Sequence, residues 1–378
     1  MDRSEAEMDS AQGVERHEAV IIGGGQAGLT TGYHLKRLGV PFMILDAQER
    51  VGDAWRTRWD SLRLFTPAWV DGLPGLPFPA PRWSFPTKDE MADYLERYTE
   101  TFELPVRNGV AIDRLSREGD RYVLSSGDRR IEADRVIVAT GANRVPKVPA
   151  FASALDPWIL QMHSAEYRNP SELREGRVLV VGVGNSGAEI SVELSRTHRT
   201  WLAGTPVGQL PVRHGTRRSR PFFRAFRSVG HHVITRGNPV GRTLIPKIEH
   251  KADPLIRVRK KDLAAAGVER VPRVTGVRDG LPLLEDGRVL EVENVIWCTG
   301  FRHDFPWIEL RAFDEEGHPR HERGVATEPG LYFVGLEFQY SFSSSVLPGG
   351  DRDARFIAEV IAKETSSDRI PQGAAGAR

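Results

Sequence analysis

A strand, a glycine-rich turn and a helix follow one another twice in this chain of 378 residues, and no other feature constrains its fold as strongly. The pattern G-x-G-x-x-G occupies 23–28, after the apolar segment Glu18–Ile22. It returns at 182–187, after Arg177–Val181. In such a turn the first glycine permits the tight bend, the second lets the backbone approach a pyrophosphate, and the third lets the helix pack on the strand. We therefore predict an α/β protein with two Rossmann-like dinucleotide-binding domains.

The first turn is predicted to hold the phosphates of one dinucleotide. The helix after it would present free N–H groups and the positive end of its dipole to the ligand. Asp46 ends the next strand, about 20 residues on, where an acid can hydrogen-bond a ribose hydroxyl, although it could also cap a turn. The residues assigned to this dinucleotide are Gly23, Gly25, Gln26, Ala27, Gly28 and Asp46.

The second turn predicts a second dinucleotide, bound by Gly182, Gly184, Asn185, Ser186 and Gly187. A flavin and a nicotinamide form the economical pair, because a hydride passes from a diffusible donor to a resident acceptor. We therefore expect FAD at the first turn and NAD(P)H at the second.

The residues after the next strand bear on the choice of nicotinamide. That strand runs into 203–205 without an acid, and Arg213 follows, which would suit the 2′-phosphate of NADPH. The pattern favours NADPH and leaves NADH open, with a solvated basic face as the other interpretation of the arginines.

The two turns also divide the chain into domains. We expect a discontinuous FAD-binding domain, formed by 17–150 and 291–363, with the NAD(P)H-binding domain inserted at 151–290. Flexible tails are expected at 1–16 and 364–378.

A basic insertion is expected inside the second domain, at about 205–261. Between Arg213 and Lys261 the basic residues greatly outnumber the two acids, Glu249 and Asp253. We favour a lid or helical insertion whose aromatic residues pack on the core. A patch for a membrane surface or an anionic substrate is the alternative.

The overall composition excludes several classes of protein. A net charge of +1 argues against nucleic acid as a partner. The single cysteine, Cys298, leaves no C-x-x-C pair for a disulfide reductase, and the chain shows no metal-ligand cluster. No apolar run approaches the roughly 20 residues of a membrane-spanning helix, and the polar start lacks a signal segment, so we expect a cytoplasmic protein.

Several segments resemble the flavin-containing monooxygenases, in particular the plant YUCCA-type and related bacterial members. Glu49–Trp55 is similar to the family's G-G-x-W segment near the flavin, with Asp53 where glycine is usual. The 139–141 segment resembles the family's A-T-G at a strand end. The resemblance thus adds Trp55, Thr140 and Gly141 to the cofactor-binding candidates.

The family's identifying signature, F-x-G-x-x-x-H-x-x-x-(Y/W), is half present. His163 and Tyr167 match it, whereas Pro157 and Ile159 replace the leading phenylalanine and glycine. The resemblance makes Tyr167 a cofactor-binding candidate and His163 a catalytic candidate, for which a hydrogen-bonding role at the domain hinge is at least an equal alternative. Thr66 takes the place of an asparagine that animal members hold near the flavin, and is the second catalytic candidate.

Small residues near the last helix would let the backbone approach the flavin ring. Gln339 and Asp351 are weaker flavin-binding candidates there, because both could simply cap or turn the chain.

The resemblance implies an NADPH-dependent monooxygenase. NADPH would reduce FAD, O2 would add to form a flavin C4a-(hydro)peroxide, and a small nucleophilic or carbonyl substrate would be oxygenated. The alternatives are a pyridine nucleotide–flavin oxidoreductase with another electron acceptor, and a non-catalytic FAD/NAD(P)-binding redox regulator. The expected partners are the small substrate and O2, and a homodimer is left open.

Overall fold

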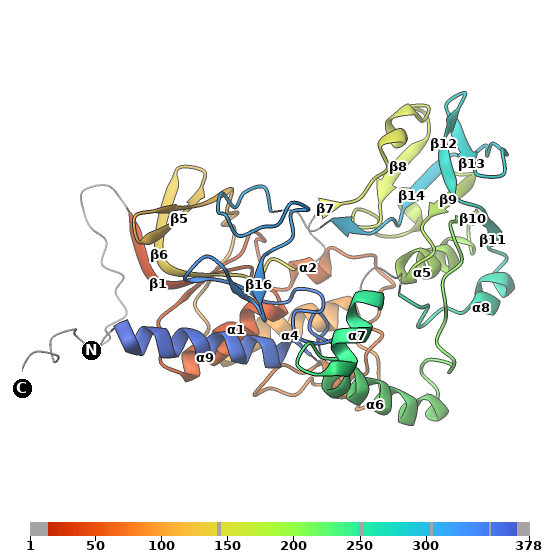
Figure 1. The fold of residues 1–378 in the computed structure, drawn as a ribbon. Helices are drawn as coiled ribbons and strands as arrows, with labels where there is room; N and C mark the ends of the chain where they lie inside the picture. Colours follow the sequence, from red (N-terminus) through yellow and green to blue (C-terminus); the bar gives the residue numbers. More distant parts are fainter. Residues whose placement is uncertain (1–13, 142–144, 249–252, 303–304, 348, 369–378) are drawn as a thin grey trace, which may run out of the picture.

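The structure is a computed structural model that describes residues 14–141, 145–248, 253–302, 305–347 and 349–368 (Figure 1). Its described strands form two larger sheets and two sheets of two strands. No helix in these residues is long and apolar enough to cross a membrane.

The first sheet has the strand order β16-β17-β18-β6-β1-β2-β3, and the β4–β5 hairpin is attached to β6. The pairs from β18 to β3 are all parallel. Its strands are β1 (Glu15–Ile22), β2 (Met43–Leu45), β3 (Val106–Arg107), β4 (Arg114–Glu118), β5 (Arg121–Ser126), β6 (Arg129–Val138), β16 (His321–Glu322), β17 (Val325–Ala326) and β18 (Leu331–Phe333).

The second sheet is entirely parallel, in the order β11-β10-β9-β14-β8. Its strands are β8 (Leu160–His163), β9 (Arg177–Val181), β10 (Arg199–Ala203), β11 (Glu269–Val271) and β14 (Asn294–Trp297). A hairpin of β12 (Val274–Arg278) and β13 (Leu281–Leu284) lies beside it, and β7 (Val145–Pro146) pairs with β15 (Phe301–Arg302) where the chain passes between the sheets.

The helices flank these sheets (Figure 1). They are α1 (Gln26–Arg37), α2 (Asp53–Arg56), α3 (Ala68–Asp71), α4 (Lys88–Thr101), α5 (Asn185–Leu194), α6 (Arg220–Ser228), α7 (Pro239–Ile248), α8 (Lys260–Ala265) and α9 (Gly350–Asp368).

Both faces of each larger sheet are covered, as parallel sheets require. Ala19 and Ile21 of β1 face the core that contains α1, α4 and α9, whereas Val20 and Ile22 face the core under the β4–β5 hairpin. The second sheet likewise separates two apolar cores. The predicted pair of parallel sheets is therefore present.

One predicted domain boundary is wrong. β14 lies between β9 and β8 in the middle of the second sheet, although the first domain was predicted to resume at 291. The chain leaves the second sheet only after Trp297. The error arose because β14 is buried on both faces, and such a strand fits the centre of either sheet equally well.

The predicted tails are shorter than expected. Glu15 and Arg16 already belong to β1, and the Glu15 carboxylate pairs with Arg107 of β3. At the other end α9 continues to Asp368, where Glu364 accepts a hydrogen bond from the Tyr332 hydroxyl. The remaining tail residues, 1–13 and 369–378, lie outside the described residues.

The basic insertion contains the helices α6 and α7 (Figure 1) and contacts the first sheet's domain, where Arg352 of α9 donates to the His231 carbonyl (2.7 Å). The chain after α6 docks there through backbone hydrogen bonds, from the Arg236 N–H to the Tyr340 carbonyl (2.7 Å) and from the Phe342 N–H to the Ile234 carbonyl (3.0 Å). The packing of its aromatic residues is only partial, since Phe226 remains 42% exposed.

Candidate functional site

The first glycine turn crosses closely over the end of β6. Gly23 has a φ of +112°, and a Cβ on it would stand 2.5 Å from the Ala139 carbonyl oxygen. A Cβ on Gly28 would stand 1.9 Å from the Gly23 carbonyl oxygen. Only glycine fits at either place, and α1 consequently lies tightly against β1.

The second glycine turn repeats this geometry against β14. Gly182 has a φ of +114°, and its Cβ would stand 2.2 Å from the Cys298 carbonyl oxygen. A Cβ on Gly187 would stand 1.8 Å from the Gly182 carbonyl oxygen. The two turns are thus built by the same contacts in two different sheets.

The middle glycine of each turn faces open space. Gly25 and Gly184 are the N-caps of α1 and α5, and a Cβ on either would meet nothing within 4 Å. Neither helix has a side-chain cap, so its first N–H groups are available to a ligand. The residues beside these openings, Gln26, Ala27 and Ser186, are partly exposed. This arrangement fits a diphosphate at each helix start.

Asp46 stabilises the first turn directly. Its carboxylate accepts hydrogen bonds from the Gly24 N–H (2.7 Å) and the Gln48 N–H (2.9 Å). Asp46 therefore caps the turn, as one of its two predicted roles requires. It does so at the strand end where a ribose would lie. Gly24 is a residue that the motif did not single out.

Asn185 holds a segment of the insertion over the second turn. Its amide donates to the Pro254 carbonyl (3.2 Å) and accepts from the Ile256 N–H (2.9 Å). The next residue, Arg257, pairs with Glu189 of α5 (3.1 Å) and donates to the Arg63 carbonyl of the first domain (2.8 Å). Asn185 thus holds the segment whose Arg257 links the two domains. Its place in the glycine motif did not indicate this role.

The other candidates of the first domain lie in two places. Trp55 of α2 packs against the core that contains α1. Thr140 and Gly141 follow β6, and the Thr140 Cα would lie 3.2 Å from a Cβ on Gly23. Their placement is compatible with the predicted flavin contacts, which remain predictions.

Thr66 lies beside a buried acid. Asp71, at the end of α3, is fully buried, and within the described part of the chain neither of its carboxylate oxygens has a hydrogen bond of ordinary geometry. Burial raises its pKa from 3.8 to about 7, and the nearby Thr66 hydroxyl offsets only part of this effect. The candidate Thr66 therefore neighbours a group that gains or loses a proton near neutral pH.

His163 occupies the hinge position. Its Nε2 lies 3.1 Å from the Gly300 carbonyl oxygen, and its Nδ1 accepts from the Ala165 N–H (3.1 Å). The ring is 2% exposed and packs edge-on against Phe301. Burial lowers the pKa of this histidine. Both ring nitrogens are engaged where the chain crosses between domains, which supports the hinge role over direct chemistry.

Two of the predicted cofactor-binding side chains are buried and hydrogen-bonded within the protein, so their predicted cofactor contacts stay predictions. Tyr167 is fully buried, and its hydroxyl donates to Glu193 of α5 (2.8 Å). Gln339 is 1% exposed, and its amide donates to the Phe333 carbonyl (3.0 Å). The polar atoms of both side chains therefore form hydrogen bonds within the protein. Asp351 similarly bonds to His34 (2.7 Å), tying α9 to α1.

Arg213 is largely solvated. Its side chain is 59% exposed and lies 4.0 Å from an oxygen of Asp262. The solvated-face interpretation of this residue is therefore the one that its surroundings favour.

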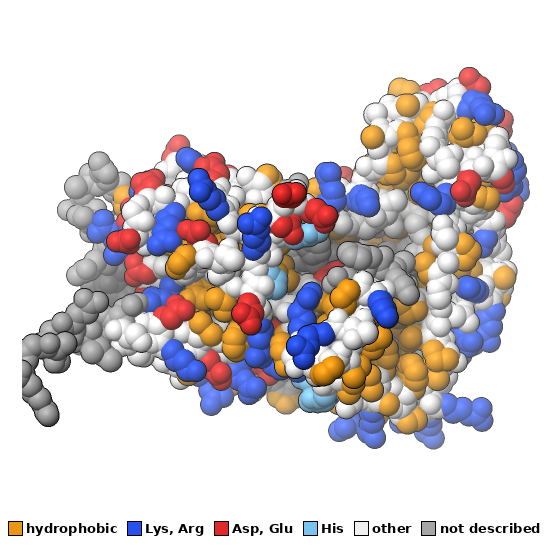
Figure 2. Space-filling model, viewed as in Figure 1, with side chains coloured by type: hydrophobic (Ala, Val, Ile, Leu, Met, Phe, Trp, Pro, Cys, Tyr) orange, Lys and Arg blue, Asp and Glu red, His pale blue; other side chains and the backbone are white. Residues whose placement is uncertain are grey.

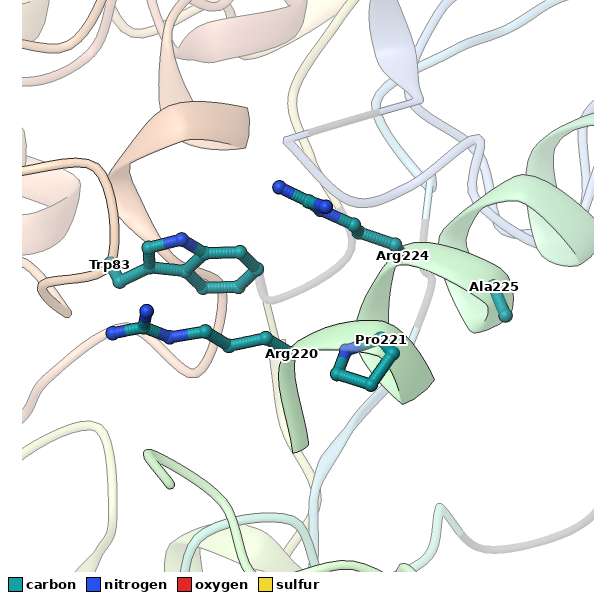
Figure 3. Close-up of a pocket in the computed structure, with 5 residues that line it drawn as sticks. All are labelled: Trp83, Arg220, Pro221, Arg224 and Ala225. Carbon is teal, nitrogen blue, oxygen red and sulfur yellow. The ribbon is translucent and has the colours of Figure 1, made fainter. Parts of the chain in front are cut away.

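The insertion meets the first domain through stacked arginine and tryptophan side chains. Trp83 lies between Arg220 and Arg224 of α6, whose guanidinium carbons are 4.9 and 5.4 Å from its ring (Figure 3). These three residues line an open pocket of about 620 Å³ together with Pro221 and Ala225. Hydrophobic and basic side chains lie together over α6 and α7 (Figure 2). The predicted membrane-surface or anionic-substrate patch remains a prediction for this face.

Comparisons with known proteins place this geometry in a family. The family model described as pyridine nucleotide-disulphide oxidoreductase matches residues 20–202. An uncharacterized CzcO-like oxidoreductase of Geobacillus kaustophilus is 37% identical over 91% of this chain and 98% of its own length. Indole-3-pyruvate monooxygenase YUCCA1 of Oryza sativa subsp. japonica is 34% identical over 94% of this chain and 95% of its own length.

A solved structure agrees with these relatives. The flavin-containing monooxygenase from Stenotrophomonas maltophilia superposes with a TM-score of 0.74 at 28% identity, covering 93% of this chain and 99% of that protein. The similarity confirms the predicted α/β fold with two Rossmann-type domains. The paired glycine turns and these relatives lead to one assignment: the chain belongs to the flavin-containing monooxygenase family and is an oxidoreductase.

Proposed function

We propose that this protein is an NADPH-dependent flavin monooxygenase that oxygenates a small nucleophilic or carbonyl substrate with O2. The observation that carries the proposal is the pair of matching cradles, one at the start of α1 and one at the start of α5, in a single chain. Two dinucleotides bound at once allow a hydride to pass from one to the other.

The chain's own residues would bind and orient the cofactors. The open N–H groups after Gly25 would hold the FAD diphosphate, and those after Gly184 would hold the nicotinamide dinucleotide diphosphate. When bound, the flavin supplies the redox chemistry and the activation of oxygen. The insertion would help to exclude water, since Arg257 donates to the Arg63 carbonyl and Arg220 stacks on Trp83, both in the first domain.

The relatives support a carbonyl compound among the substrates. The rice relative is named for its action on indole-3-pyruvate, which carries a carbonyl group. Cys298 would take no part, because burial raises the pKa of its thiol to about 12 and the chain has no second cysteine. A cytoplasmic location and a homodimer belong to this proposal as untested predictions.

The test is anaerobic reduction by NADPH followed by air. The flavin colour should bleach with NADPH, and the absorbance of a C4a adduct should then appear before the oxidised spectrum returns. If NADPH bleaches the flavin but air produces no adduct and no oxygenated product, the protein is instead a reductase with another electron acceptor. Tight nucleotide binding without bleaching would indicate a redox regulator.

A further inference from the structure

The residue that follows the second strand of each glycine-turn unit, where the ribose of the dinucleotide is expected, differs between the two sheets. In the first sheet β1 and β2 end together, Ile22 pairing with Leu45, and Asp46 follows. In the second sheet β9 and β10 end together, Val181 pairing with Ala203. The residue equivalent to Asp46 is therefore Gly204, which has no side chain.

A guanidinium from the neighbouring strand reaches this position. Arg270 of β11 pairs in register with Leu202 of β10, and β11 lies at the edge of the sheet beside β10 (Figure 1). The Arg270 Nη2 donates to the Gly204 carbonyl oxygen (3.4 Å). Gly204 in turn lies against the second turn, since a Cβ on it would stand 3.3 Å from Val183. Arg270 thus extends to the strand end beside the proposed nucleotide cradle.

The charge of Arg270 is poorly compensated. Among the residues that the structure describes, none hydrogen-bonds to its buried Nε, and burial is the cause that lowers the pKa of the guanidinium. The adjacent acid, Glu269, pairs with Arg199 instead (3.4 Å). A half-buried cation that no described acid neutralises is costly to maintain, and a bound anion would lower that cost.

We propose that Arg270 binds the 2′-phosphate of NADPH and thereby selects NADPH over NADH. The inference rests on the proposed function only in placing the nicotinamide dinucleotide at the second turn. In Rossmann-like domains the ribose 2′-position lies at the end of the strand equivalent to β10, where an arginine accommodates the 2′-phosphate. Charge-assisted hydrogen bonds from a guanidinium suit this group. Arg213, the residue that the sequence suggested, is solvated and lies near Asp262.

Calorimetric titration of the FAD-loaded protein with NADP⁺ and with NAD⁺ tests the assignment without catalysis. Arg270→Gln should weaken NADP⁺ binding by roughly 10- to 100-fold, the range for a hydrogen bond to a charged group, and leave NAD⁺ binding unchanged. The matched variant Arg213→Gln should change either affinity by less than about threefold. Retained NAD⁺ affinity also shows that the Arg270→Gln protein is folded.

Three results would overturn the assignment of Arg270. These are an equal loss of both nucleotides in Arg270→Gln, a selective loss of NADP⁺ in Arg213→Gln alone, and a wild-type protein that binds the two nucleotides equally. A different result would refute the proposed monooxygenase function. A protein that discriminates NADP⁺ through Arg270 but forms no oxygenated product would refute the monooxygenase and retain this residue's role.

Discussion

Replacing Asp71 by Asn should change how the stability of the protein depends on pH. The carboxyl group is fully buried at the end of α3, and burial raises its pKa from 3.8 to about 7. The folded protein therefore keeps a proton that the unfolded chain releases from about pH 4 upward. Because the native state binds more protons than the unfolded state, the free energy of unfolding falls as pH rises toward 7 and then levels off.

The size of this effect follows from the pKa shift. Each pH unit between the two pKa values changes the free energy of unfolding by about 1.4 kcal/mol. Between pH 5 and pH 8 only the two units below pH 7 count, so Asp71 should cost the protein about 3 kcal/mol over this interval. An asparagine amide does not titrate in this range, so the Asp71→Asn protein should lose none of this amount.

Guanidinium chloride unfolding of the FAD-saturated proteins at pH 5 and pH 8 measures the difference. The free energy of unfolding of the wild type should fall by about 3 kcal/mol more than that of Asp71→Asn. Asp120→Asn, which alters an exposed acid in the β4–β5 turn, serves as the control and should follow the wild type. Parallel pH dependence in the wild type and Asp71→Asn would refute the buried-acid reasoning.

The glycine turns supply the remaining predictions. Gly25→Trp should fill the open space at α1 and yield a colourless protein, and a yellow, FAD-loaded variant would contradict this. Gly184→Trp should stay yellow but no longer bleach with NADPH, as anaerobic spectra would show. Gly187→Ala should destabilise the protein by about 1–3 kcal/mol, because its Cβ would meet the Gly182 carbonyl. Gly276→Ala, which meets nothing within 4 Å, should show no such loss in thermal unfolding.

Elements with strong local signals can be predicted from the sequence. The start of α4 carries a capping box, in which the side chains of Thr87 and Glu90 each accept a hydrogen bond from the other's backbone N–H. β9 ends and α5 begins at the second glycine turn, as the turn pattern predicts. By contrast, β6 is one strand over Arg129–Val138 whose length the sequence pattern does not indicate. A polar stretch interrupts its apolar pattern, and only pairing with β1 and β5 shows it to be continuous.

The candidate site divides in the same way. The glycines that form the two turns could be recognised because a close backbone approach permits one residue type, and for Gly28 and Gly187 the approaching carbonyl is only five residues away in the chain. For Tyr167 and Gln339 the sequence could not show that both side chains are buried and hydrogen-bonded within the protein, because burial is set by contacts between distant segments. Asp71 and Arg270 carried no signal at all, because their unusual environments are created by distant segments.

The amino-acid sequence by itself indicated two nucleotide-binding turns and which residues form them, since the third glycine of each turn must clear the carbonyl oxygen of the first, five residues before it. Only the tertiary structure decided that β14 lies at the centre of the second sheet, that His163 stands at the crossing between domains, and that Arg270 reaches the end of β10. These outcomes depend on which strands pair and which charges lose their water, and both are set by contacts between residues far apart in sequence.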